Sequence, residues 1–179
     1  MNTKKNSKIL ALLLALAMVF VMSVPAFADT ETSTHTVNIY VQEAERATDD
    51  SIVSTTVHNN GQPVTVTVND GATLKDAINI ACNTPGSYIS NVVWNTDFPE
   101  FLTALSLDEE VRQNQDNYIY DYPEVGKTTY QGLSWMYFNG NPSMMPASSY
   151  TYPDVSLGAK IVTEDTTITL SYESLTFVW

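Results

Sequence analysis

The sequence predicts an α+β fold, in which a mixed sheet packs on one principal helix. Three observations predict it. Alternating apolar and polar residues dominate the chain before residue 70, one short stretch then changes to helical spacing, and alternation returns near the C-terminus. Strands that precede and follow a single helix are typical of an antiparallel or mixed sheet with its helix on one face.

The first strand is predicted where Val37, Ile39 and Val41 share one face of an extended segment. Residues 51–70, "SIVSTTVHNNGQPVTVTVND", then contain two alternating runs separated by Asn-Gly at position 60. Asn-Gly is the strongest short signal for a β-hairpin. We therefore expect two strands that fold back on each other at this turn.

The principal helix is predicted within "GATLKDAINIACN". Its apolar residues fall on one stripe: Leu74, Ala77, Ile78 and Ala81. Thr73 and Asp76 have the spacing of an N-terminal capping pair. The breaker "NTPGS" ends the helix, and "YISNVVW" resumes extended structure as far as Trp94.

Residues 95–130 have the least regular pattern and are predicted to form a long irregular insertion. Within it, Ser106 and Glu109 resemble a capping box and favour one or two helical turns. Strands are expected again in "LSWMYFNG" and in "TTITLSYESLTFVW". A sheet of this kind wrapped on one helix is the plan of the β-grasp folds.

The N-terminus has the pattern of a secretory signal peptide. Three lysines precede an apolar run that ends at Met22, and Ala-Phe-Ala closes the segment at Ala28. We expect cleavage after Ala28, secretion to the extracellular space and no membrane attachment afterwards. Residues 29–35 are expected to be a flexible lead-in, and residues 36–179 a single domain.

Charge excludes one class of partner. The chain has 8 basic and 20 acidic residues, a net charge of −12, and loss of the three basic residues in the signal segment would lower it to −15. Such a chain repels phosphate backbones, so we expect no nucleic-acid partner. Cys82 is the only cysteine, which rules out an intrachain disulfide and fits a bacterial exported protein.

Three segments resemble the DUF4430 family, which is related to the C-terminal domain of transcobalamin. They are "GATLKDAI" at residues 71–78, "WMYFNG" at residues 135–140 and "EDTTITLSY" at residues 164–172. The resemblance spans roughly residues 36–173 and implies a β-grasp-like binding domain. In transcobalamin-type proteins this domain is a lid over a corrinoid. The resemblance therefore implies that this chain binds a cobalamin-like ligand, either alone or as a lid for a partner protein.

Aromatic and methionine residues supply the candidate ligand-binding site. We expect it to comprise Trp94, Trp135, Tyr137, Asn139, Met144, Met145 and Tyr150. Aromatic faces give a large contact area with few rotatable bonds, and methionine adapts to irregular surfaces. Because Trp135 and Tyr137 share one face of an alternating strand, the same pair would equally serve as core.

Catalysis and metal binding find little support in the sequence. The two histidines, His35 and His58, fall in the lead-in and beside the Asn-Gly turn, and no His/Cys spacing is that of a metal site. We therefore expect a secreted non-catalytic ligand-binding module rather than an enzyme. The alternative is an extracellular interaction or adhesion domain, in which the same aromatic residues contact a protein or a glycan.

Overall fold

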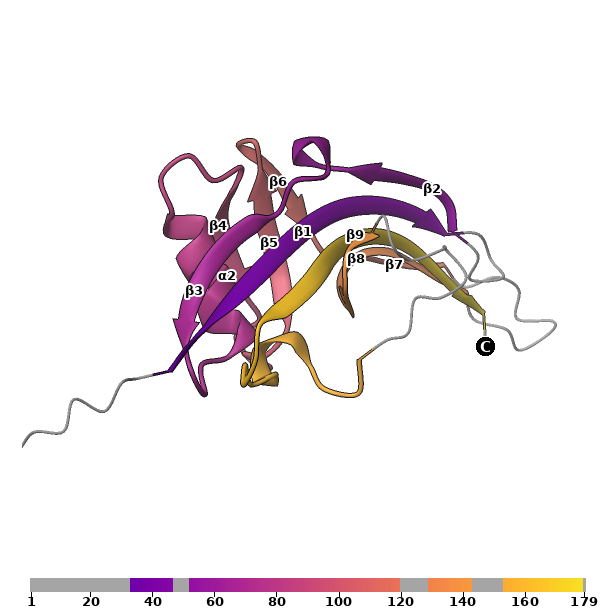
Figure 1. Cartoon of the computed structure of the whole chain (residues 1–179). Coiled ribbons are helices and arrows are strands. Elements are labelled where there is room, and N and C mark those ends of the chain that lie inside the picture. Colours follow the sequence, from indigo (N-terminus) through magenta and orange to yellow (C-terminus); the bar gives the residue numbers. More distant parts are fainter. Residues whose placement is uncertain (1–32, 47–51, 120–128, 143–152, 179) are drawn as a thin grey trace, which may run out of the picture. The chain divides into compact units, whose positions relative to one another are not determined.

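Two long parallel strands, β1 (Thr34–Arg46) and β9 (Thr166–Val178), form the centre of the main sheet (Figure 1). The computed structural model describes residues 33–46, 52–119, 129–142 and 153–178. Within them the main sheet has the order β2-β1-β9-β8-β7, and β3 also pairs with β1. A second sheet has the order β4-β5-β6.

The remaining elements follow one another closely along the chain. They are β2 (Ile52–Val57), η1 (Asn59–Gly61), β3 (Val64–Asn69), α2 (Leu74–Asn83), β4 (Ile89–Trp94), β5 (Leu102–Leu107), β6 (Glu110–Gln113), β7 (Gln115–Ile119), β8 (Thr129–Asn139) and η4 (Leu157–Ala159). A mixed sheet with one principal α-helix confirms the α+β, β-grasp-like prediction.

The first strand starts earlier than predicted. β1 begins at Thr34, and His35 lies inside it with its Nε2 2.9 Å from Asp70 Oδ1. His35 therefore does not belong to a flexible lead-in. The alternation of residues 36–41 was visible in the sequence, whereas this polar start is held by pairing with β3 and by the contact to Asp70.

The predicted hairpin at Asn-Gly is wrong. β2 and β3 both pair antiparallel with β1, β2 along residues 42–46 and β3 along residues 34–39, so the chain continues in one direction along the same edge. Asn59, Asn60 and Gly61 have φ of 50°, 53° and 74° and form a local bulge between the two strands. These residues tolerate positive φ, and here that tolerance interrupts an edge strand instead of reversing it.

The helix prediction is confirmed residue by residue. Leu74, Ala77, Ile78 and Ala81 are the buried stripe of α2. The Thr73 hydroxyl accepts from the backbone N–H of Asp76, and the Asp76 carboxylate accepts from the Thr73 backbone N–H at 2.8 Å. The Asp76 carboxylate also accepts from the Thr73 hydroxyl at 2.8 Å. The bonds that the backbone N–H and then the hydroxyl of Thr73 donate to this carboxylate stabilise its charged form and hold the pKa of Asp76 below its usual value.

Where the structure describes it, at residues 95–119 and 129–130, the predicted irregular insertion is largely extended structure. Ser106 lies in β5, and Asp108 and Glu109, with φ of 48° and 71°, form the two-residue turn that joins β5 to β6. The Ser106–Glu109 spacing therefore marks a hairpin, not a helix. Apolar and polar residues do not alternate in β5, because Leu102, Ala104, Leu105, Ser106 and Leu107 are all buried.

The two faces of the main sheet differ in composition. One face contributes Val37, Ile39, Ile168 and Leu170 to a core shared with α2 and with β4 and β5. The opposite face is also buried near β9 but is polar. There Gln42 Nε2 donates to Ser171 Oγ at 3.0 Å, and Arg46 Nε lies 2.5 Å from Glu173 Oε2. A buried ion pair of this kind contributes little net stability and costs much when one partner is removed.

Candidate functional site

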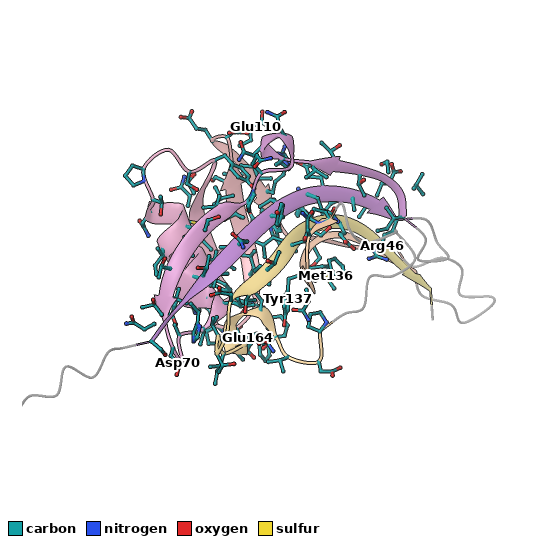
Figure 2. All side chains as sticks on the ribbon, viewed as in Figure 1. Arg46, Asp70, Glu110, Met136, Tyr137 and Glu164 are labelled. Carbon is teal, nitrogen blue, oxygen red and sulfur yellow. The ribbon has the colours of Figure 1, made fainter. Side chains whose placement is uncertain are left out.

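A hollow of about 340 Å³ lies beside β8, on the side of the loops before β5 and before η4. We call it the apolar hollow, because aromatic and aliphatic side chains make up most of its lining. It is lined by Phe101, Leu102, Ser134, Trp135, Met136, Tyr137, Pro153, Val155, Ser156 and Leu157. Figure 2 labels Met136 and Tyr137, two of its neighbouring lining residues on β8.

Two aromatic residues are fixed in place along β8 at this hollow. Trp135 and Tyr137 point to the core face of the sheet and are each 7% exposed. Trp135 Nε1 donates to the Arg112 carbonyl at 2.9 Å, and its backbone N–H donates to Asn114 Oδ1 at 2.9 Å. The Tyr137 hydroxyl donates to the Val155 carbonyl, and burial raises the pKa of Tyr137. Their rings therefore have set orientations before any ligand arrives.

The rim of the hollow exposes apolar surface. Phe101 is 52% exposed and packs edge-to-face on Phe98, with ring centroids 6.3 Å apart. Val155 faces solvent as well. Sequence reasoning missed these residues because they lie in loops. Asn95 was the residue that could have indicated an ordered loop here, because asparagine often accepts from backbone N–H groups a few residues ahead. Its Oδ1 accepts from the N–H groups of residues 97 and 98 and so shapes the loop that carries Phe98 and Phe101.

The two loops that border the hollow are held against each other by a close backbone contact. Gly158 N–H donates to the Glu100 carbonyl at 2.9 Å. A Cβ atom at Gly158 would lie 2.6 Å from Glu100 Cα, so only glycine fits there. Lys75 Nζ also donates to the Pro99 carbonyl at 2.7 Å, which ties one loop to α2.

The structure brings together only part of the predicted site. Trp135 and Tyr137 line the hollow, but both are core residues, so neither offers a free stacking face. Trp94 packs beside α2, with its Nε1 donating to Asn79 Oδ1 at 3.0 Å, and Asn139 is exposed at the end of β8; neither residue lines this hollow. Met144, Met145 and Tyr150 lie outside the described residues.

The described residues of the apolar hollow include no pair of titratable side chains that could act as general acid and base. The lining residues that the structure describes include no histidine, cysteine, carboxylate or amine. Elsewhere, Cys82 is half-buried and its pKa is raised to about 11 by desolvation, which leaves the thiol protonated and unreactive at neutral pH. Over the residues that the structure describes, no group of three or more His, Cys, Asp or Glu could hold a metal ion.

A second, larger hollow of about 540 Å³ borders the same sheet, where β2, β1, β9 and β8 face β6. We call it the polar hollow, because charged and hydroxyl side chains are prominent in its lining. It is lined by Glu43, Ala44, Glu45, Ser54, Thr56, Val111, Arg112, Gln115, Leu133, Tyr172 and Ser174. The rings of Trp135 and Tyr172, with centroids 5.1 Å apart, place one residue of each hollow in direct contact.

Comparison with known proteins adds no further assignment. No protein-family model, curated protein or solved structure matches the chain. Among the described helices, none is long and apolar enough to cross a membrane.

Proposed function

We propose that this chain is an exported, non-catalytic binding module whose apolar hollow takes an apolar group of a small ligand. The observation that supports it is the concave, mainly apolar lining, with Phe101 and Val155 exposed at its rim and the buried Trp135 and Tyr137 held by hydrogen bonds behind them. Ligand sites are typically concave and apolar, with a few placed polar groups that orient the ligand. Among the described lining residues, Ser134 and Ser156 offer side-chain hydroxyls for that role besides Tyr137.

The size of the hollow limits how a ligand would bind. Its volume of about 340 Å³ is near the lower end of the range for small-molecule sites. A corrinoid, the ligand class implied by the resemblance to DUF4430 and transcobalamin, is too large to enter whole. It would lie across the rim formed by Phe101 and Val155 and insert one peripheral group. This arrangement is that of a lid rather than an enclosing cage.

The chemistry of the lining supports binding rather than catalysis. General acid–base chemistry at neutral pH needs a group with a pKa near the working pH. Among the described residues of the lining, the only titratable group is the Tyr137 phenol, which is engaged with the Val155 carbonyl and has a raised pKa. The expected secretion rests on the N-terminal signal pattern of residues 1–28.

The test is a calorimetric titration of purified residues 29–179 with cobalamin, cobinamide and an anilinonaphthalene sulfonate probe. Ser156→Phe would fill the apolar hollow and should weaken binding at least tenfold. Ser54→Phe, which adds the same group in the polar hollow, is the matched control and should leave binding unchanged. Binding that ignores Ser156→Phe, or no binding by a folded sample, would contradict the proposal.

A protein-interaction role is the second candidate, because Phe98, Phe101 and Val155 expose apolar surface close together in two loops that are in contact. Phe98 separates the two candidates, since it does not line the hollow. Phe98→Ser should leave a small ligand inside the hollow bound as before. The same change should weaken an apolar protein contact, whose energy comes from buried aromatic anchors.

A further inference from the structure

The polar hollow has a regular floor built from four neighbouring strands. The pairing registers place Ser54, Glu45, Ser174 and Leu133 in one row across β2, β1, β9 and β8. Neighbouring strands lie about 4.8 Å apart, so this row offers hydroxyl, carboxylate, hydroxyl and apolar groups at even spacing. Such an array presents hydrogen-bonding groups over an extended, shallow surface.

The adjacent row continues the same alternation. Thr56, Glu43 and Tyr172 are cross-strand neighbours two residues further along each strand. Side chains two residues apart in a strand point to the same face, so both rows face the same hollow. The floor therefore combines two carboxylates and three hydroxyl side chains with the apolar surfaces of Leu133 and Tyr172.

One wall of the polar hollow is held in place by charge-assisted hydrogen bonds. Arg112 Nε donates to Glu43 Oε1 at 2.8 Å, and its Nη1 and Nη2 both donate to Glu110 Oε2 at 3.0 Å. His58 Nε2 lies 3.1 Å from the same Glu43 oxygen. These contacts fix the Glu43 carboxylate from two sides and raise the pKa of Arg112, so the wall is ordered without a ligand.

From this arrangement we propose that the polar hollow binds a neutral saccharide. A sugar hydroxyl both donates and accepts, which matches a lining that mixes carboxylate acceptors, hydroxyls and the Gln115 amide. Leu133 and Tyr172 supply apolar surface for the C–H face of a sugar ring. An anion is disfavoured because Glu43, Glu45 and Glu110 outnumber Arg112.

A cationic ligand is the less favoured occupant. Glu43 and Glu110 both contact the single guanidinium of Arg112, and Glu43 also contacts His58, so the oxygens of these two carboxylates that form the contacts are already engaged within the protein. Glu45 receives a weak contact from the Ser54 hydroxyl at 3.4 Å and is the carboxylate with most freedom to accept from a ligand. This site is separate from the apolar hollow and does not depend on the function proposed for it.

The experiment is a titration of residues 29–179 with maltotriose, triacetylchitotriose and spermidine, followed by calorimetry at low and high salt. Glu45→Ala and Ser174→Val each remove ligand hydrogen-bond partners and should weaken saccharide binding about tenfold. Glu164→Ala removes one carboxylate well away from Glu110 and the polar hollow (Figure 2) and should have no effect. Near-UV circular dichroism verifies the fold of each variant.

The expected result is salt-insensitive binding of at least one trisaccharide that is lost in Glu45→Ala and Ser174→Val. Binding of spermidine alone, weakened by salt, would overturn the proposal in favour of a cation site. Absence of binding to both trisaccharides by folded protein at millimolar concentration would overturn it as well. If saccharide binding persisted in both variants, the sugar would bind elsewhere on the protein, and the proposal would again be overturned.

Discussion

The apolar hollow and the polar hollow both border the main sheet, yet they differ in chemistry. They meet where Trp135 packs on Tyr172. On one side of that contact, the loops that carry Phe101 and Val155 border β8, and none of their carboxylates is among the described lining residues of the apolar hollow. On the other side, β6 brings Arg112 over the carboxylates of β1. One sheet therefore supports two kinds of site, and the side chains that the bordering segments contribute decide which.

The difference also predicts different responses to the environment. The contacts around the apolar hollow are packing and neutral hydrogen bonds, such as that from Tyr137 to the Val155 carbonyl. Those around the polar hollow are ion pairs of partly exposed side chains, with Arg112 25% and Glu43 34% exposed. Of these two kinds of contact, only the ion pairs are screened appreciably by salt. The loss of stability caused by a substitution should therefore depend on salt at the polar hollow and not at the apolar hollow.

The largest loss of stability is expected from removing the contact between Trp135 and Tyr172, which joins the two hollows. Trp135→Ala would leave a cavity beside Tyr172 and remove the hydrogen bond from the indole Nε1 to the Arg112 carbonyl, so the free energy of unfolding should fall by about 3–5 kcal/mol. Urea denaturation measures it. Trp94→Ala is the control, since Trp94 is only half-buried and should cost less. If both variants lost the same free energy of unfolding, Trp135 would contribute no more to stability than the half-buried Trp94, and this prediction would be wrong.

A smaller effect, confined to the apolar hollow, is expected at Gly158. Gly158→Ala forces a Cβ into the Glu100 backbone, and overpacking of this kind costs about 1–3 kcal/mol. Thermal unfolding together with probe binding would show weaker occupancy of the apolar hollow and unchanged saccharide binding. Ala159→Gly, at an exposed neighbouring position, serves as the control. Loss of both binding activities would mean that the two hollows are not independent.

A hydroxyl deletion tests the fixed aromatic of the apolar hollow. Tyr137→Phe removes the bond to the Val155 carbonyl and should cost about 1 kcal/mol. Because the folded pKa of Tyr137 is raised, its stabilisation is complete below the unfolded value of about 10 and is lost as pH rises through the folded value. Stability measured from pH 8 to 12 should therefore fall less steeply in Tyr137→Phe than in the parent chain. Identical slopes would contradict this.

The smallest effect is expected in the polar hollow. Glu43→Gln weakens the contacts to Arg112 and His58, but these side chains are partly exposed, so the loss should be about 0–1 kcal/mol. The loss should shrink further in 1 M salt, where charges are screened over about 3 Å. Glu164→Gln gives the matched change of charge at an exposed site. A salt-independent loss would mean that Glu43 acts through packing instead.

Part of the site was open to prediction from sequence and part was not. The alternation of β8 placed Trp135 and Tyr137 on one face, and both residues line the apolar hollow, together with Ser134 and Met136 from the other face. Trp94 was grouped with them because it is aromatic, but β4 belongs to the second sheet and packs Trp94 against α2. Phe98 and Phe101 were not selected, since a loop has no periodicity that predicts where its side chains meet.

The misassigned elements have a common physical cause. Asn-Gly at position 60 and Asp108 with Glu109 are both short segments that accept positive φ. The residue types decide that these segments can adopt positive φ. They do not decide whether the segment becomes a hairpin turn or a bulge. At Asn60 the long edge of β1 keeps both flanking strands antiparallel to it, so the chain bulges; at Asp108 the pairing of β5 with β6 closes a true hairpin.

The sequence by itself determined the elements whose signal is local. The capped helix from Leu74, its buried stripe and the alternating strands β1, β3, β8 and β9 all follow from side-chain periodicity and hydrogen bonds within a few residues. Only the tertiary structure decided the parallel pairing of β1 with β9, the second sheet and the two hollows. The pairing of β1 with β9 depends on contacts between residues more than a hundred positions apart, such as Glu43 with Tyr172. The second sheet and the two hollows depend on which segments meet in space, and no local pattern records that choice.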